Sequence, residues 1–302
     1  MKSPILGVVG LCSLFAAGDG TAQQAPPRPK ILGIAYVRFA TSDFCKARDF
    51  YMRILGHPIE CKAGEGSVGG PVPLNATQLV ALSTWQSSHK SNLLEEIGFA
   101  TDDIVALRRY FDLDKIPATS PDAHGPADKF LRITDPEGHQ ISFLQSSPDH
   151  RTPNSACPAT LRIIHAGFVV HDREAMDKFY KDILGFRVYW HGGMKDGVDD
   201  WVDMQVPDGT DWIEYMLNVP TNASKHTLGV MNHIALGVLD IHRAAKQLLN
   251  NGMKLTEEPK IGRDGKWQLN LYDPDDTRVE LMEFTPAQKP CCSEYTGPHP
   301  KP

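Results

Sequence analysis

The sequence predicts an α+β fold built from four βαβββ modules, two in each half of the chain. The helix-like segment SDFCKARDFYMRILGHPI recurs later as HDREAMDKFYKDILGFRV. A second pair, GFATDDIVALRRYF and IALGVLDIHRAAKQLL, reads as a strand that leads into a helix. Each of these is followed by a strand, an Asp-Pro turn and another strand. The chain therefore repeats as two halves, and each half repeats within itself.

The two repeated helices end in the same way. An aromatic pair, Phe50-Tyr51 in the first helix and Phe179-Tyr180 in the second, is followed by Ile-Leu-Gly. Gly56 and Gly185 then stand just past the last turn. A glycine is favoured there because it adopts positive φ without strain. This match fixes the alignment of the two halves.

Composition is that of a soluble globular protein with room for two domains. The chain has 302 residues, of which 41% are hydrophobic and 23% are charged. The net charge is −6 and the basic residues form no stripe, so no nucleic-acid partner is expected. We expect a small-molecule substrate as the partner. The sequence leaves a monomer and a homodimer open.

Residues 1–22 read as a secretory signal peptide. Lys2 precedes an apolar run from Ile5 to Ala17, and small residues follow up to Ala22. The apolar run is too short to serve as a membrane span. We therefore expect cleavage after Ala22, no membrane span, and a periplasmic or secreted protein.

Breaks in the periodic pattern divide the rest of the chain. Residues 31–146 are predicted to form an N-terminal domain and residues 160–286 a C-terminal domain. Residues 147–159, which are rich in Pro and Ser, are predicted to form a linker between them. Residues 287–302 are again rich in Pro and are predicted to form an irregular tail.

Five cysteines follow the predicted signal peptide. Disulfides can form in an exported protein, and the odd number leaves at least one thiol unpaired. The pairing stays open. The adjacent pair in the Pro- and Gly-rich tail favours a structural role over a catalytic one. The five residues are Cys45, Cys61, Cys157, Cys291 and Cys292.

Four polar side chains in the C-terminal half point to one metal site. His165, Glu214, His233 and Glu280 each stand in a short run of alternating apolar residues, which is typical of a half-buried strand. Burying a lone imidazole or carboxylate is costly unless it is paired or holds a metal. The interval from the first to the second residue is close to that from the third to the fourth, so each pair spans one module. We therefore predict that all four side chains meet.

These motifs together resemble the vicinal oxygen chelate superfamily, which includes glyoxalase I, methylmalonyl-CoA epimerase, fosfomycin-resistance proteins and extradiol dioxygenases. The motifs are the helix end FYxxxLG, the strand NHIAL and the segment DPxxxxVELME. The resemblance covers residues 31–285. It implies two glyoxalase-like domains with cup-shaped mixed sheets. Because His-Glu-His-Glu is one ligand set of glyoxalase I-like members, it also implies that the four residues bind the metal.

Two imidazoles and two carboxylates suit one divalent metal ion and leave one or two positions for water or substrate. Ni, Zn, Co, Mn and Fe(II) all stay open, and the lack of cysteine ligands argues against a purely structural zinc. Such an ion acts as a Lewis acid that stabilises an enediolate. We predict that Glu280 or Glu214 acts as the general base on the substrate carbon.

Strand alternation predicts which neighbours face the same cavity as these ligands. Small residues beside the histidines, among them Gly167 and Gly237, are expected to leave room for a ligand. Ile164 is expected to face the covering helices. The predicted substrate-binding residues are Trp212, Met216, Gln268, Asn270, Tyr272 and Arg278.

The N-terminal half keeps the modules but not the ligands. By the matched helices and Asp-Pro turns, Tyr36, Glu96 and Ser142 stand where the two histidines and the last glutamate stand in the C-terminal half. The fourth position falls near Gln78–Val80 and has no carboxylate. This half is expected to bind no metal and to serve as a scaffold, a lid or an interface.

Three functions compete. We expect an exported metal-dependent lyase or isomerase that acts on a small carbonyl or hydroxy-acid substrate. An extradiol-type ring-cleaving dioxygenase with Fe(II) would use His165, His233 and Glu280, which leaves Glu214 superfluous. It would also place an acid–base histidine in this half, and Trp267–Tyr272 contains none. A small-molecule binding protein would need no ligands. Export also argues against the intracellular thiol cofactor of glyoxalase I.

Overall fold

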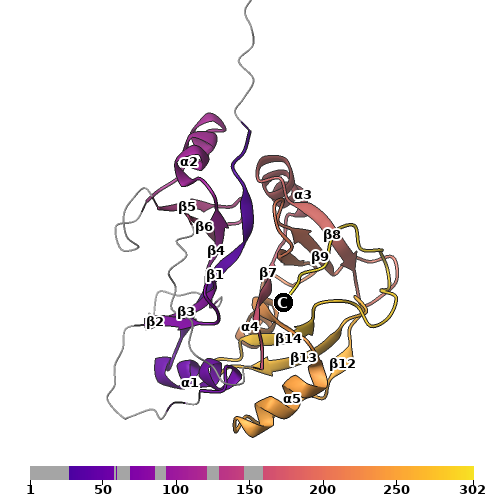
Figure 1. The fold of residues 1–302 in the computed structure, drawn as a ribbon. Helices are drawn as coiled ribbons and strands as arrows, with labels where there is room; N and C mark the ends of the chain where they lie inside the picture. Colours follow the sequence, from indigo (N-terminus) through magenta and orange to yellow (C-terminus); the bar gives the residue numbers. More distant parts are fainter. Residues whose placement is uncertain (1–26, 58, 60–68, 86–92, 121–128, 146–158) are drawn as a thin grey trace, which may run out of the picture.

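The structure is a computed structural model, and it contains two separate sheets, one in each half of the chain (Figure 1). The predicted signal peptide and almost all of the predicted linker lie outside the described residues. No helix among the described residues is long and apolar enough to cross a membrane. The described residues are 27–57, 59, 69–85, 93–120, 129–145 and 159–302.

The N-terminal half forms a six-stranded mixed sheet with the strand order β2-β3-β1-β4-β6-β5. Its elements in chain order are β1 (Ile31–Thr41), α1 (Phe44–Ile54), β2 (Gly69–Pro73), β3 (Leu79–Thr84), β4 (Leu94–Thr101), α2 (Ile104–Leu113), β5 (Phe130–Thr134) and β6 (Gln140–Gln145).

The C-terminal half forms an eight-stranded mixed sheet with the strand order β12-β13-β14-β11-β7-β10-β9-β8. Its helix α3 continues as a short π-helical stretch, η2. Its elements in chain order are β7 (Arg162–Val169), α3 (Arg173–Asp177), η2 (Lys178–Ile183), β8 (Arg187–Gly192), β9 (Trp201–Gln205), β10 (Trp212–Met216), α4 (Lys225–Met231), β11 (His233–Val238), α5 (Ile241–Asn250), β12 (Lys260–Ile261), β13 (Trp267–Tyr272) and β14 (Arg278–Glu283).

The α+β fold with repeated modules is confirmed, with one difference in strand number between the halves. In the C-terminal half, each module has one strand, its helix and then three strands. In the described part of the N-terminal half, each helix is followed by two strands. The short helix α4, which the pattern did not predict, precedes β11 and begins at Ser224, whose hydroxyl accepts from the amide of Thr227.

Four helices begin with the same device, which explains why the modules resemble one another. An aspartate caps each helix and accepts a hydrogen bond from the amide three residues later, an interaction worth about 1 kcal/mol. The predicted glycines at two helix ends are confirmed, because Gly56 and Gly185 have φ values of 80° and 76°. The four capping residues are Asp43, Asp103, Asp172 and Asp240.

The two faces of the eight-stranded sheet are buried differently. Val279 and Leu281 of β14 join the large apolar core that includes the buried helix residues. Met282, two positions on from Glu280, and Phe284 join a smaller cluster on the other face with Trp190. This alternation places Glu280 on the face opposite the helices, as predicted.

One facing prediction was wrong because β7 contains a β-bulge. His165 pairs with Ala235 and Ile163 with Leu236, which leaves Ile164 as an extra residue between them. Ile164 therefore packs in the smaller cluster with Trp212 rather than against the helices. The bulge shifts the alternation of every residue that precedes it.

Buried polar contacts join the two halves. The Nε2 of Gln78 donates to the carbonyls of Ile34 and Ile163 at 2.8 and 3.0 Å, and its Oε1 accepts from the Ile163 amide at 2.8 Å. Asp211 accepts from the Ile34 amide at 2.9 Å and pairs with Arg162. These contacts tie β1 to β7, the strand that carries His165.

Candidate metal centre

Four adjacent strands, β14, β11, β7 and β10, bring the four predicted ligands together. Ala235 of β11 pairs with His165 on one side and with Glu280 on the other. Gly167 of β7 likewise pairs with His233 on one side and with Glu214 on the other. Each imidazole therefore has a carboxylate two strands away on the same face, in a nearly symmetric arrangement.

The donor atoms of these residues converge. The Nε2 atoms of His165 and His233 are 3.1 Å apart. The Oε2 of Glu214 lies 3.2 Å from the His233 Nε2 and 3.9 Å from that of His165. The Oε2 of Glu280 lies 3.6 Å from the His165 Nε2 and 3.9 Å from that of His233. The five distances between donor atoms of these four side chains thus all lie between 3.1 and 3.9 Å.

This spacing fits a common metal ion. Two donors that are each about 2.1 Å from one ion lie about 3 to 4 Å apart, depending on the angle between them. His165, Glu214 and His233 also form a triad whose donor atoms all lie within 4.8 Å of one another. Buried imidazole and carboxylate donors without thiolates suit a divalent ion. These residues therefore fit the ion that the sequence predicts.

The orientation of His233 follows from a backbone contact. Its Nδ1 lies 3.0 Å from the carbonyl oxygen of Met231, which can only accept, so the proton is on Nδ1. The Nε2 then keeps its lone pair and faces His165. The Arg278 Nη2 lies 2.7 Å from this Nε2 and 3.0 Å from the Nδ1, which places the guanidinium against the ring and not in line with the lone pair of either nitrogen. A guanidinium thus provides positive charge beside the donor set.

Gly167 is required by this arrangement. A Cβ at this position would meet the ring of His233 at 2.1 Å. At Gly237 a Cβ would meet Phe284 at 2.3 Å. The prediction that small residues leave room for a ligand was therefore wrong, because protein side chains fill that space.

Burial sets the protonation of the four groups. It holds the pKa of His165 well below the usual value, and the nearby His233 and Arg278 lower it further. Burial and Arg278 likewise lower the pKa of His233. Burial raises the pKa of Glu214 to about 7 and that of Glu280 to about 8, although Arg278 partly offsets both shifts. The imidazoles are therefore neutral, which is the form that binds metals.

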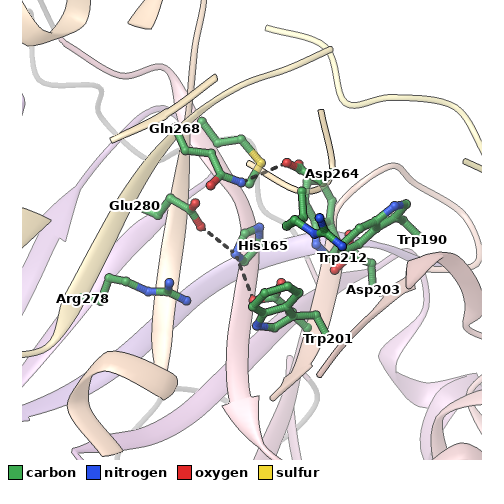
Figure 2. A pocket seen from close by; sticks show the side chains of 12 residues that line it. His165, Trp190, Trp201, Asp203, Trp212, Asp264, Gln268, Arg278 and Glu280 are labelled. Atoms are coloured by element: carbon green, nitrogen blue, oxygen red, sulfur yellow. Dashed lines mark hydrogen bonds and ion pairs between the residues drawn. The ribbon is translucent and has the colours of Figure 1, made fainter. Parts of the chain in front are cut away.

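A cavity of about 90 Å³ opens beside the donor set (Figure 2). Three tryptophans, Trp190, Trp201 and Trp212, line it together with three of the four predicted ligands. Such a volume is well below the roughly 300–1,000 Å³ of sites for drug-sized ligands. The cavity therefore suits a compound of a few carbon atoms.

Only half of the predicted substrate-binding residues line this cavity, namely Trp212, Gln268 and Arg278. Met216 packs instead in a separate apolar cluster with Val169.

Asn270 and Tyr272 were also predicted to line the cavity and do not. Both donate to Glu257, at 3.0 and 2.7 Å, from the same strand face. Glu257 lies before β12, and strand alternation alone gives no sign that it reaches these side chains.

Several cavity residues were missed from the sequence. Asp203 and Asp264 line the cavity and are almost fully buried. Lys266, which does not itself line the cavity, is fully buried with its Nζ 4.3 Å from the centre of the Trp212 ring. Asp203 stands in the alternating segment WVDMQV, which is the signal that revealed the four ligands. Applied to this strand, the same pattern would have found it.

The tail residues 287–302 contain no helix or strand, yet they pack against the site. The Tyr295 hydroxyl donates to the carbonyl of Asp264 at 2.8 Å, and the Trp190 Nε1 donates to the carbonyl of Cys291 at 3.2 Å. Cys291 and Cys292 form a disulfide with each other. Cys45 is also disulfide-bonded. The tail thus supports the outer side of the cavity.

The equivalent place in the N-terminal half holds an ionic cluster. Glu96 accepts from Arg132 at 2.8 and 3.0 Å, pairs with Arg38 at 3.2 Å and accepts from Ser142. Burial alone would raise the pKa of Glu96, but these hydrogen bonds and charges hold it below the usual value.

The strand register corrects the fourth equivalent position. Arg38 pairs with Glu96 and with Ala81, just as Gly167 pairs with His233 and with Glu214. Ala81 is therefore the counterpart of Glu214. The sequence match placed it near Gln78–Val80 because it lacked this register.

Comparison with known proteins agrees with this geometry. Residues 162–281 match the family model of the Glyoxalase/Bleomycin resistance protein/Dioxygenase superfamily. A lactoylglutathione lyase of Haemophilus influenzae is 26% identical over 41% of this chain and 93% of its own length. A probable chloroplastic lactoylglutathione lyase of Arabidopsis thaliana is 23% identical over 43% of this chain. The matched segment covers only 38% of the length of that relative.

Solved structures share the fold over both halves. Homoprotocatechuate 2,3-dioxygenase from Brevibacterium fuscum superposes with a TM-score of 0.60 at 19% identity, covering 85% of this chain and 82% of that one. The corresponding enzyme from Arthrobacter globiformis gives 0.59 at 17% identity, covering 85% and 81%. A catechol 2,3-dioxygenase gives 0.61 at 15% identity, covering 87% and 92%. The match to the superfamily model thus covers the C-terminal half, which carries the four predicted ligands, and the solved structures share the fold of both halves.

Proposed function

We propose that the protein is an exported metal-dependent lyase or isomerase that acts on a small carbonyl or hydroxy-acid compound. One observation carries this proposal: the donor atoms of His165, Glu214, His233 and Glu280 lie 3.1 to 3.9 Å from their partners in the set. A binding protein without chemistry has no need for four converging donors. The relatives named as lactoylglutathione lyases support the same reaction class.

The chain's own residues account for the binding of substrate. The two imidazoles and the two carboxylates would hold one divalent ion. When bound, such an ion supplies Lewis-acid stabilisation of negative charge on a substrate oxygen. Trp201 and Trp212 line the small cavity and give it apolar walls. Arg278, which lines the cavity, offers its guanidinium to an oxygen of the substrate.

A carboxylate of the same set would move the proton. In the ion-free site burial raises the pKa of Glu280 to about 8 and that of Glu214 to about 7, and a bound divalent cation would lower both, leaving ionised carboxylates that can accept a proton. Glu280 is nearly buried, with 6% of its side chain exposed, whereas 14% of Glu214 is exposed. The more secluded Glu280 is therefore the better base.

An extradiol dioxygenase is the second candidate, and the solved structures that share the fold favour it. That reaction needs three protein ligands and open positions for both substrate and dioxygen. In this chain Glu214 lies nearer to the His233 Nε2 than Glu280 does, at 3.2 against 3.9 Å. A fourth ligand at this place leaves too few open positions, so we favour the lyase or isomerase.

Metal analysis of the purified protein, combined with a Glu214→Ala variant, tests the choice. We expect one equivalent of a divalent ion, loss of metal affinity and rate in the variant, and no oxygen uptake with catechols. Fe(II)-dependent oxygen uptake that survives Glu214→Ala would establish the dioxygenase instead. Two equivalents of metal per chain would contradict the single site.

Export is part of the proposal and rests on residues 1–22 alone. Expression with the leader in a secreting host, followed by mass spectrometry, should reveal a chain that begins near Gln23. An intact Met1 in the native host would remove export from the proposal and leave the metal chemistry unaffected.

A further inference from the structure

The cavity has a second polar side, away from Glu280 and Arg278, where Asp203, Trp212 and Asp264 lie together (Figure 2). Asp203 and Trp212 are 4% and 1% exposed, and both line the cavity. Among the described residues, neither the Asp203 Oδ1 nor the Trp212 Nε1 has a hydrogen-bond partner. An acceptor and a donor thus remain unpaired at one cavity wall. Such groups are costly unless a ligand or water pairs with them.

Two of the neighbouring polar groups of this wall, Asp264 and Arg263, already have hydrogen-bond or ion-pair partners. Asp264 accepts from the Gln268 Nε2 at 3.0 Å and from the Tyr295 hydroxyl at 3.3 Å. The Lys266 ammonium lies over the Trp212 ring, although among the described residues its Nζ has no hydrogen-bond partner. Arg263 is paired with Asp196 at 2.6 Å. Among the residues that line this wall, the Asp203 Oδ1 and the Trp212 Nε1 are therefore the groups left for a ligand to pair with.

The sheet register fixes how far this wall is from the candidate metal ligands. Asp203 pairs directly with Glu214 across β9 and β10, and Trp212 pairs with His165 across β10 and β7. Neighbouring strands are about 4.8 Å apart. A ligand that reaches both the candidate ligands and Asp203 therefore needs to span only one or two carbon–carbon bonds.

The charge balance indicates what kind of group belongs there. Counted as formal charges, the carboxyl groups of Asp203, Asp264, Glu214 and Glu280 carry four negative charges and Lys266 and Arg278 carry two positive ones, a difference that a divalent ion would balance. Without an ion, burial raises the pKa of Asp203, Glu214 and Glu280, so these carboxyls hold protons. An ammonium group on the ligand would add an unbalanced buried charge, which is costly. A hydroxyl group donates to a carboxylate and accepts from an indole N–H without adding charge.

We propose that Asp203 and Trp212 form a hydroxyl-recognition point, which selects substrates with a free hydroxyl on the carbon beside their two metal-binding oxygens. This inference rests on the proposed metal function and adds a substrate class to it: small, uncharged polyhydroxy carbonyl compounds. The Asp203 Oδ1 accepts from the hydroxyl, and the Trp212 Nε1–H donates to it.

Two ketones that differ by one hydroxyl test the proposal. Dihydroxyacetone and hydroxyacetone are both uncharged, and both have a carbonyl and a hydroxyl on adjacent carbons. Protein is loaded with Zn²⁺, elemental analysis establishes one ion per chain, and titration calorimetry gives the Kd of each ketone. The variants are Asp203→Ala, the shape-conserving Asp203→Asn, and Trp212→Phe. Asp199→Asn is the matched control, because Asp199 belongs to the same half and pairs with Arg173 outside the cavity.

We expect the wild type and Asp199→Asn to bind dihydroxyacetone about tenfold more tightly than hydroxyacetone, as one buried hydrogen bond allows. The ratio of the Kd of hydroxyacetone to the Kd of dihydroxyacetone should fall to about one in Asp203→Ala. It should take intermediate values in the other two variants. The Kd of hydroxyacetone should change less than about twofold. Melting curves check that each variant is folded.

The two proposals fail in different ways. Protein that takes up no zinc contradicts the metal function before any ketone is added, and removes the basis of this inference with it. A ratio near one on zinc-loaded wild type, or a tenfold ratio that persists in Asp203→Ala, overturns the hydroxyl-recognition point alone.

Discussion

The two halves of the molecule use the same strand positions for different chemistry. In the N-terminal half, Glu96 is surrounded by two arginines and Ser142, and its charge is balanced within the protein. In the C-terminal half, the positions paired across the strands in the same way are Gly167, His233 and Glu214. There, neutral imidazoles and carboxyl groups converge.

The decisive residue is the one in the middle of these three paired positions. Arg38 provides a cation where the C-terminal half has Gly167, and Gly167 leaves the space that the His233 ring fills. A site whose charges are already paired has no demand for an ion, whereas donors that converge without a shared cation create one. The comparison teaches that the arrangement of partners, rather than the fold, decides which half can bind a metal.

The largest expected difference between the halves is in metal retention. His233→Ala removes a donor 3.1 Å from the His165 Nε2 and should abolish stoichiometric metal binding. Glu96→Ala, at the equivalent position, should leave one equivalent bound. Elemental analysis after gel filtration measures both, and metal retained by a double His233→Ala/Glu280→Ala variant would mean that the site lies elsewhere.

Activity should separate the halves next. Glu280→Gln keeps the shape of the side chain but removes the base, and should lower the rate by about 10²–10⁴-fold even where the metal stays bound. Ser142→Ala, at the equivalent N-terminal position, should leave kcat unchanged. Steady-state kinetics on metal-loaded protein decide this, and a full rate in Glu280→Gln would transfer the role to another group.

Stability should show the opposite asymmetry. Glu96→Gln leaves two arginines without their carboxylate, and breaking a buried pair costs about 3–5 kcal/mol. Because Arg132 and Arg38 are 24% and 27% exposed, we expect a loss nearer to about 2 kcal/mol. Denaturant unfolding with chelator present measures it. A double-mutant cycle with Arg132→Gln should recover part of the loss, and additivity would argue against the ionic cluster.

The smallest expected difference is in how the free energy of unfolding depends on pH, an effect that we expect from the C-terminal half alone. Burial raises the pKa of Glu280 to about 8 and that of Glu214 to about 7, so the ion-free folded state holds protons that the unfolded chain releases. Stability therefore falls as pH rises from the usual carboxyl pKa through these raised values, and levels off above about pH 8. The buried histidines act oppositely, but only below about pH 6.5.

Between pH 6.5 and 8 the two carboxyl groups therefore determine how stability changes with pH. Each lowers the free energy of unfolding by at most about 1.4 kcal/mol per pH unit. Unfolding in chelator across this window should have a smaller slope in Glu280→Gln than in the wild type. Glu96→Gln should leave the slope unchanged, because the pKa of Glu96 is lowered. Equal slopes in the wild type and Glu280→Gln would refute the raised pKa.

The sequence was informative wherever one strand carries its own signal. Alternation with a period of two identified His165, His233 and Glu280 as facing away from the helices, because side-chain direction is a local property of a strand. The glycines at two helix ends, Gly56 and Gly185, were equally local. These features need no knowledge of partners.

What the sequence did not predict depends on partners that are distant in the chain. Asn270 and Tyr272 bind Glu257, although their alternation suited the cavity. Ile164 faces the cavity side because a bulge forms opposite Ala235, which only the pairing of β7 with β11 reveals. Asp203 carried a readable pattern, but its place beside Glu214 depends on the register of β9 with β10. Register and long-range hydrogen bonds arise from the assembled sheet.

The strand order also has a consequence for when the site forms during folding. His165 and Glu280 come from β7 and β14, the first and last strands of this sheet in the chain, with β11 between them in space. Contacts between such distant segments close late, since loop-closure entropy opposes them until other contacts exist. An ion can thus bind only a sheet that has already assembled. It should slow unfolding while leaving the refolding rate unchanged, as a ligand of the finished fold and not its nucleus.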